Sequence, residues 1–202
     1  MPPVRQIQPS LNGHSPAETV SPLKLFEFHG LDLRPNGNGQ SVGECPFCGK
    51  GKFHVNGSTG LWDCKVCGEK GNNYGFLRAL HKLAADTTTD ADLAELAVDR
   101  GIVYGESLRS WGVVKSPATG EWLVPGGGVD GELNQLYKYV LDTKSKKRRL
   151  YASPGLGQYM GGVNLYEPKK PDVILCEGVW DGIALWESLR SAKSVDGALH
   201  MT

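Results

Sequence analysis

The fold is decided by residues 45–68, which read CPFCGKGKFHVNGSTGLWDCKVCG. Two C-x-x-C pairs, separated by 15 residues, supply Cys45, Cys48, Cys64 and Cys67. Each pair wraps one tight turn and directs two sulfurs at one point, and a glycine follows each pair where the backbone folds back. Four thiolates form a closed tetrahedral zinc site, which stabilises a fold but leaves no open position for catalysis. The sequence therefore predicts a structural zinc site, with redox-active dithiols as the alternative.

The residues between the two cysteine pairs predict β-hairpins. Residues 52–55 and 61–62 are apolar or β-prone and flank the turn sequence at 56–60. The zinc-binding segment is too small to fold by burial of apolar surface alone. We therefore expect the metal to supply its stability.

Composition limits the class of protein. The 202 residues suit one domain or two small ones, and 40% hydrophobic with 22% charged residues argues against general disorder. No apolar run is long enough to span a membrane, and residues 1–21 lack the apolar core of a secretory signal. Lys+Arg and Asp+Glu are 22 each, which excludes a globally basic nucleic-acid binder but allows a local basic patch.

The cysteine count indicates the compartment. Five cysteines, two C-x-x-C pairs and a lone Cys176, are typical of metal binding in a reducing cytoplasm and not of a disulfide framework. Cys176 is interpreted as a buried strand residue.

The rest of the chain predicts an α+β fold. A loose tail covers residues 1–20, a loop residues 32–43 and a linker residues 84–88. Helices are expected at residues 23–28, 73–82, 90–100, 106–110 and 181–190. Strands are expected at residues 122–124, 136–141, 149–151 and 172–176, the last feeding a helix as at the start of a βαβ unit.

The zinc-binding segment is more basic than the chain as a whole. Between residues 41 and 82, six Lys and Arg residues face three acidic ones, with Phe53, His54 and Trp62 among them. Cations beside flat rings suit single-stranded nucleic acid, because phosphates are neutralised while bases stack. The candidate contacts are Lys50, Lys52, His54, Trp62 and Lys65. The alternative is that the rings cover the zinc and the lysines are ordinary solvated surface.

Two acidic residues follow the last apolar strand run. Glu177 stands at its carboxyl end, where open α/β sheets place ligands, and Asp181 lies in the first turn of the next helix. Both carboxylates can point into one crevice and hold Mg²⁺ through oxygen and water. The alternative is a solvated loop glutamate and a helix-capping aspartate.

Three stretches give the chain a resemblance to the DnaG-type and phage-type DNA primases. Residues 45–77, with their two cysteine pairs and following helix, resemble the primase zinc ribbon. Residues 149–154 and 162–166 resemble the amino-terminal half of the polymerase core, and residues 176–185 resemble the opening of the toprim fold. The first and last stretches are specific, and the middle one is weak by itself.

The resemblance implies a DNA-directed RNA polymerase activity that makes primers for DNA replication in the primosome. It implies four zinc-binding cysteines, with Glu177 as the toprim acid acting near Mg²⁺ and Asp181 as the acid on the following helix. Its partners would be single-stranded template DNA, ribonucleoside triphosphates and a replicative helicase, in the cytoplasm of a bacterium or a phage-infected cell. No membrane partner is expected.

The resemblance also divides the chain. Residues 1–40 would be a flexible tail with a short helix, 41–83 the zinc ribbon with its helix, 84–110 a helical linker and 111–202 the first part of the polymerase core, toprim-like from about residue 171. Residues 144–149 are five cations in six positions, and Arg149 falls where the family has a basic residue facing template or nucleotide. Lys146, Lys147, Arg148 and Arg149 are therefore candidate nucleic-acid contacts, with a solvated hairpin turn as the alternative.

One departure from the family limits the expected activity. The family's second acidic motif, Asp-x-Asp, has no counterpart in the 25 residues after Glu177, so the toprim segment looks truncated, with residues 173–175 at an exposed sheet edge. The sequence therefore predicts weak or absent polymerisation. The alternatives are a non-catalytic zinc-ribbon protein that binds single strands or a replisome partner, and a recombination mediator resembling RecR.

Overall fold

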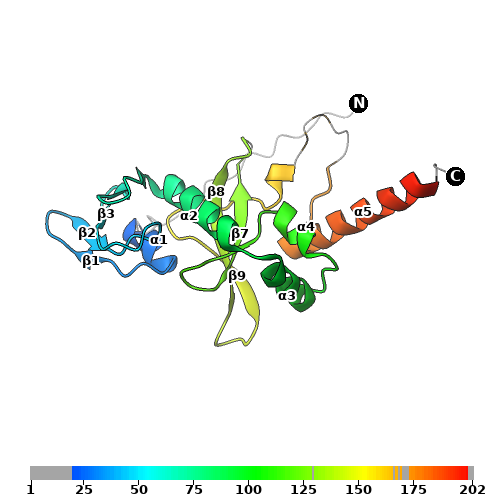
Figure 1. Cartoon of the computed structure of the whole chain (residues 1–202), viewed down its shortest axis with the longest axis horizontal. Helices are drawn as coiled ribbons and strands as arrows, with labels where there is room; N and C mark the ends of the chain where they lie inside the picture. The colour runs from blue at the N-terminus through cyan, green and yellow to red at the C-terminus, as the bar shows by residue number, and fades with distance from the viewer. Residues whose placement is uncertain (1–19, 129, 166, 168, 170–172, 200–202) are drawn as a thin grey trace, which may run out of the picture.

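The structure is a computed structural model that describes residues 20–199 apart from 129, 166, 168 and 170–172 (Figure 1). The α+β fold class is confirmed: two antiparallel sheets combine with helices and a four-cysteine cluster. The helices are α1 (Leu23–Phe28), α2 (Asn73–Thr87), α3 (Asp90–Arg100), α4 (Gly105–Ser110), the 3-10 turn η1 (Val163–Leu165) and α5 (Val179–Leu199). The strands are β1 (Arg34–Pro35), β2 (Gln40–Gly43), β3 (Phe53–Asn56), β4 (Trp62–Cys64), β5 (Lys70–Gly71), β6 (Val114–Lys115), β7 (Trp122–Gly127), β8 (Leu133–Leu141) and β9 (Arg148–Ala152).

The first sheet holds the cysteines, and its five short strands lie in the order β1-β2-β3-β4-β5. The loop expected over residues 32–43 is wrong, because β1 and β2 form a hairpin there. Its turn is the Asn-Gly-Asn-Gly sequence at 36–39, closed by the amide of Asn36 donating to the carbonyl of Gln40 at 2.8 Å. The sheet therefore begins at Arg34, before the expected ribbon boundary at residue 41.

The second sheet has the order β6-β7-β8-β9, and its strands are longer. The three strands expected here are found, each longer than expected by two or three residues, while β6 was not predicted. β7 pairs with β8 from Trp122–Tyr139 to Gly127–Leu133, with a bulge between Gly126 and Gly127.

Helix α2 lies between the two sheets (Figure 1). It begins at the cap Asn72, whose side chain accepts from the amide of Gly75 at 2.9 Å. Its buried residues belong to one core that includes Phe53 of the first sheet and Leu136 of the second. The linker expected at residues 84–88 is wrong, because Ala84 is fully buried and the helix continues to Thr87.

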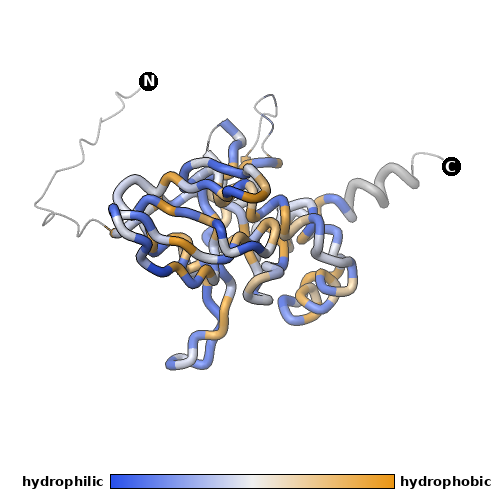
Figure 2. The backbone as a smooth tube through the Cα atoms, turned by 60° about the vertical axis from the view of Figure 1, so that its left-hand side comes forward, coloured by the Kyte–Doolittle hydropathy of each residue, from blue (hydrophilic) through white to orange (hydrophobic). Residues whose placement is uncertain are grey.

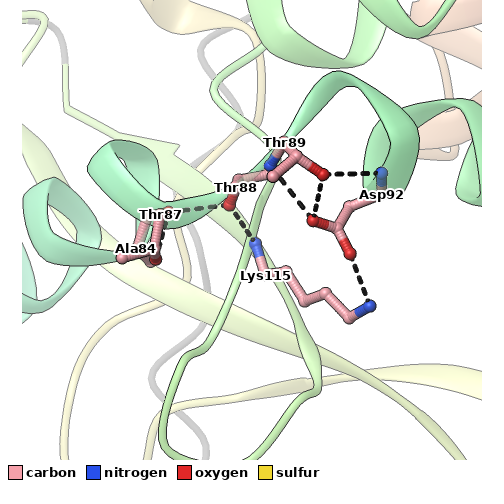
Figure 3. Close-up of polar contacts among 6 residues, drawn as sticks. All are labelled: Ala84, Thr87, Thr88, Thr89, Asp92 and Lys115. Carbon is pink, nitrogen blue, oxygen red and sulfur yellow. Dashed lines mark hydrogen bonds and ion pairs between the residues drawn. The ribbon is translucent and has the colours of Figure 1, made fainter.

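A polar network fastens the junction between α2 and α3 to strand β6 (Figure 3). The Thr88 hydroxyl donates to the carbonyl of Ala84 at 2.7 Å and accepts from the amide of Lys115 at 2.8 Å. Thr89 and Asp92 form a capping box at the start of α3, and the Lys115 ammonium contacts Asp92 at 2.7 Å. The donated hydrogen bonds from Lys115 and Thr89 hold the pKa of Asp92 well below its usual range.

A buried histidine joins the N-terminal helix to the second sheet. His29, which follows α1, lies 1% exposed with its Nε2 at 2.8 Å from the Ser153 hydroxyl. That hydroxyl donates to the carbonyl of Leu136 at 2.6 Å. Burial and the nearby Lys138 charge lower the pKa of His29 to about 3, so the ring is neutral at pH 7.

The C-terminal helix is held against α4 by a buried carboxylate. Glu187, 7% exposed, accepts from the amides of Val103 at 2.9 Å and Tyr104 at 2.7 Å and from the Ser107 hydroxyl at 2.9 Å. These donors lie at the start of α4, so a side chain from α5 acts as its cap.

Trp111 fills the space between α5 and the segment before η1. An added Cβ at Gly162 would lie 2.6 Å from the Trp111 ring, and one at Gly182 would lie 2.7 Å from it. Glycines at these two positions therefore let the ring pack between the two segments.

The molecule is elongated, with the cysteine-bearing sheet at one end and α5 reaching away at the other (Figure 1). The β8–β9 hairpin projects from the body, and in Figure 2 the same projection is hydrophilic at its tip. Within the described residues, no helix is both long and apolar enough to cross a bilayer.

Candidate metal centre and nucleic-acid surface

The four cysteines lie in two matching turns of the first sheet. Cys45 and Cys48 follow β2, while Cys64 ends β4 and Cys67 lies in the turn beyond it. In the first turn the amide of Gly49 donates to the carbonyl of Cys45 at 2.8 Å, and in the second the amide of Gly68 donates to that of Cys64 at 3.0 Å. Gly49 and Gly68 have φ values of 67° and 81°, a left-handed conformation that glycine adopts without strain.

The sulfur geometry fits zinc. All four Sγ atoms lie within 4.8 Å of one another, with Cys45–Cys67 at 3.8 Å and Cys48–Cys64 at 3.7 Å. A tetrahedral site with Zn–S bonds of about 2.3 Å requires S–S edges of about 3.8 Å. Among the residues described, no other group of three or more His, Cys, Asp or Glu side chains converges in this way. The four cysteines are therefore positioned to bind a zinc ion.

The sulfur contacts favour the metal over redox dithiols. Both of the short contacts above join opposite turns and not the two cysteines of one C-x-x-C pair. Burial raises the pKa of the Cys45 thiol to about 12, whereas the backbone amide of Cys67 lowers that of Cys64 to about 7. Four protein ligands close the coordination sphere, so the metal would hold the two turns together and supply no Lewis acid.

Aromatic rings pack behind the metal centre and do not face solvent. Trp62 is 4% exposed, and its ring stacks on Phe53 with centroids 5.3 Å apart and contacts Phe76 edge-on at 6.0 Å. Its Nε1 donates to the carbonyl of Asn72 at 2.9 Å, which ties the first sheet to the start of α2. The prediction that Trp62 contacts nucleic acid is therefore corrected, because neither ring face is accessible to a base.

The outer face of the first sheet carries a cross-strand row with one residue from each of the five strands, four of them polar. Register places Arg34 opposite Val42, Val42 opposite His54, His54 opposite Asp63 and Asp63 opposite Lys70. Arg34 and Lys70 are exposed and His54 is half-buried. Arg34 and Lys70 were missing from the candidate residues, because only the strand register shows that they share a face with His54.

The predicted ribbon lysines gather near the metal. Lys50, Lys52 and Lys65 are exposed, and the Lys65 amide donates to the carbonyl of Lys52 at 3.1 Å, which brings the two turns side by side. Lys65 also forms an ion pair with Asp63. The second predicted group, residues 146–149, is exposed but lies at the β8–β9 hairpin, apart from the first sheet (Figure 1).

The segment before α5 differs from the sequence prediction. Residues 173–176 form no strand, and Val173, Ile174 and Leu175 are 57%, 62% and 73% exposed. Cys176 is exposed as well, so its interpretation as a buried strand residue is wrong. A strand needs a partner for its hydrogen bonds, and none of the nine strands described pairs with this segment.

Glu177 and Asp181 lie at the start of α5. Asp181 is in the first turn, as expected, and α5 extends beyond the predicted 181–190 at both ends. Both carboxylates are exposed, and no third acidic ligand joins them among the described side chains. Two carboxylates can hold Mg²⁺ only with water or substrate as the further ligands.

Comparison with known protein families finds no match for the chain, and comparison with curated proteins finds none either. Among solved structures, the chain is similar to the zinc-binding and RNA polymerase domains of the Aquifex aeolicus primase, at 15% sequence identity and a TM-score of 0.35. The similarity covers 83% of this chain and 62% of that one, so the chain spans less than two thirds of the solved protein.

Proposed function

We propose that this chain binds single-stranded template DNA through its zinc ribbon and takes part in RNA primer synthesis during DNA replication. The observation that carries the proposal is the four-cysteine centre beside an outer sheet face bearing Arg34, His54 and Lys70. The sequence motifs shared with DNA primases support the same function.

The ribbon would bind template mainly through phosphates. Lys50, Lys52 and Lys65 lie at the cysteine end of the sheet, and the cross-strand row adds Arg34 and Lys70 at its two edges, with His54 and Asp63 between them. The core rings Phe53 and Trp62 pack the inner face of the sheet, so the backbone positions that carry the cations are in place before a ligand binds. Charge neutralisation by a preformed surface costs little ordering entropy, and the binding should weaken as salt increases.

The start of α5 is the proposed site of nucleotide addition. Glu177 and Asp181 would hold Mg²⁺, which when bound steadies the triphosphate and the attacking hydroxyl. Trp111, packed against Gly162 and Gly182, would keep this end of α5 in place. Ribonucleoside triphosphates are the proposed substrates, and a replicative helicase in the cytoplasm is the proposed partner.

A second candidate function is binding to single strands without catalysis. It is favoured by the exposed apolar residues 173–175, which lie immediately before Glu177 and lack the sheet that would fix a catalytic acid.

One preparation separates these functions. Zinc content, anisotropy of a labelled mixed-sequence single strand and primer synthesis from labelled ribonucleotides with Mg²⁺ would be measured together. We expect about one zinc per chain and an affinity for the strand that Lys50→Gln with Lys52→Gln reduces, while the control Lys24→Gln with Lys82→Gln does not. Primer that disappears in Glu177→Gln supports the first function, and strand binding without primer supports the second. A protein without zinc overturns both.

A further inference from the structure

The β8–β9 hairpin ends in a projecting basic tip. The tip, residues 142–149, reads DTKSKKRR, and it extends away from the body (Figures 1 and 2). It holds five cations and one acidic residue, Asp142. The proposed template surface on the first sheet does not include it.

The tip is ordered by its own hydrogen bonds. One Asp142 carboxylate oxygen accepts from the amides of Lys144 at 2.8 Å and Ser145 at 3.1 Å, and the other accepts from the Tyr151 hydroxyl at 3.0 Å. These bonds lower the pKa of Asp142 to about 2, so the carboxylate stays ionised. Backbone bonds of 2.8 Å from Lys146 to Asp142 and from Asp142 to Lys147 close the turn. A ligand therefore meets a preformed tip and need not order a mobile loop.

The two arginines lie on opposite faces of the hairpin. Arg148 is opposite Leu141 and Arg149 opposite Val140, and successive strand residues point to opposite faces. Arg148 faces the body, 3.8 Å from Asp99 and with its guanidinium 5.6 Å from the Tyr139 ring centroid. Arg149 lies 3.6 Å from Asp142. Both side chains remain about half exposed, at 45% and 57%, and available to an anion.

The cations of the tip are suited to bind phosphates on two sides of the hairpin. Residues 142–149 contain no aromatic ring, so the base stacking that single-strand binding uses is absent from the tip. The major groove of B-form DNA admits a two-stranded β-ribbon, and both of its walls carry phosphates. A ribbon with cations on both faces matches such a groove better than it matches a single strand.

We infer that the tip binds double-stranded DNA by entering the major groove, with Lys146 and Lys147 leading. This inference goes beyond the proposed function, because it requires neither template binding by the zinc ribbon nor primer synthesis. The inferred contacts are ion pairs with the phosphates of both groove walls, which carry no base sequence.

The test compares a labelled mixed-sequence DNA duplex with one of its own strands by fluorescence anisotropy on the full chain. The tip variant is Lys146→Asn with Lys147→Gln. Asn suits position 146 because Lys146 has a φ of 57°, a left-handed value that Asn tolerates, so the variant keeps the turn. Lys24→Gln with Lys82→Gln removes two exposed lysines elsewhere and serves as the control.

The tip variant should weaken duplex binding about tenfold at 50 mM salt and reduce the salt slope by about 1.8, from two lost phosphate contacts. Single-strand affinity should stay constant, and the control should match the parent. An RNA–DNA hybrid should bind less tightly than the DNA duplex, because the A-form major groove is deep and narrow.

Three results would overturn the inference: duplex affinity unchanged in the tip variant, an equal loss for duplex and single strand, or equal affinity for hybrid and DNA duplex. The ribbon variant Lys50→Gln with Lys52→Gln keeps the two proposals apart. If it leaves single-strand binding intact while the tip variant loses duplex binding, the template surface is refuted and the duplex site is supported.

Discussion

The two sheets of this protein are stabilised by different interactions. The first has strands of two to four residues, and its core holds two cysteines and a cluster of aromatic rings. The second pairs a six-residue strand with a nine-residue one, and its core includes aliphatic residues from α3 and α4. Short strands form few ladder bonds, so the first sheet needs a metal where the second relies on length and burial.

The comparison also shows where the two sheets depend on each other. Helix α2 presents Phe76 to the rings of the first sheet and Leu80 to the same continuous core that reaches Leu136 of the second. Unfolding of the first sheet should therefore extend to α2 before it affects α3 and α4, which lie in a separate core.

Removing one zinc ligand should give the largest effect. Cys64→Ser should abolish zinc binding, whose apparent free energy in small zinc domains is about 10–16 kcal/mol, and should unfold the first sheet. Hydrogen exchange should show lost protection over residues 34–71 and retained protection in β7 and β8. Zinc content would be measured on the same sample.

The matched control is Cys176→Ser. Cys176 is exposed and outside the sulfur cluster, so zinc content and protection should equal those of the parent. If Cys64→Ser lost hydrogen-exchange protection equally in both sheets, the metal would not stabilise the first sheet separately from the second.

Replacing Phe76, the ring by which α2 contacts the first sheet, tests the link between the two sheets. Phe76→Ala removes a fully buried ring that contacts Phe26, Phe47, Phe53 and Trp62. Loss of a buried Phe side chain costs about 3–5 kcal/mol, and urea unfolding would measure it. Leu61→Ala, at a 57% exposed position, should change stability by about 0.5 kcal/mol or less. A similar result for both variants would show that α2 is not held by this cluster.

A comparison of two glycines with the same φ distinguishes the cost of a steric clash from the cost of backbone strain. Gly131 and Gly162 both have a φ of 76°, but an added Cβ meets nothing within 4 Å at Gly131 and the Trp111 ring at 2.6 Å at Gly162. Gly131→Ala should therefore cost about 1 kcal/mol from strain alone, and Gly162→Ala about 2–3 kcal/mol. Chemical denaturation of both variants gives the difference, and equal values would mean that Trp111 moves aside freely.

Acid sensitivity should give an effect similar in size to that of the glycine substitutions, at most about 2 kcal/mol between pH 6.5 and 5. The unfolded chain protonates His29 below its usual pKa of 6.5, whereas the folded protein excludes that proton down to about pH 3. The free energy of unfolding should therefore fall as pH decreases from 6.5, by at most about 1.4 kcal/mol per pH unit from this residue.

His29→Gln keeps a hydrogen-bonding group beside Ser153 and removes the titration. Unfolding would be measured from pH 7 to 5 in saturating zinc, where Asp92 and Asp142 stay ionised because their pKa values are lowered. The slope of stability against pH should be shallower in the variant, and an identical slope would place the acid sensitivity elsewhere.

Much of the metal centre could be predicted from the sequence because its determinants are local. Two C-x-x-C pairs with a hairpin between them require no distant partner, and the structure brings the four sulfurs together as expected. The cross-strand row was not predictable in the same way, since Arg34 joins His54 only through the register of β1, β2 and β3.

The errors share one cause, which is that burial depends on neighbours distant in the chain. From the sequence alone, Trp62 could be a base-stacking ring or a core ring. The structure shows a core ring, because Phe76 packs against it. Residues 173–175 are apolar enough for a buried strand, yet in this structure they are exposed because no strand pairs with them.

The capping of α4 by Glu187 has a consequence for the newly made chain. The acceptor lies 84 residues after the amide of Val103 that donates to it. At translation rates of roughly 5–20 residues per second, that amide waits about 4–17 s for its carboxylate to be synthesised. The zinc-binding end of the protein can therefore be complete on the ribosome while the amides at the start of α4 still bond to water.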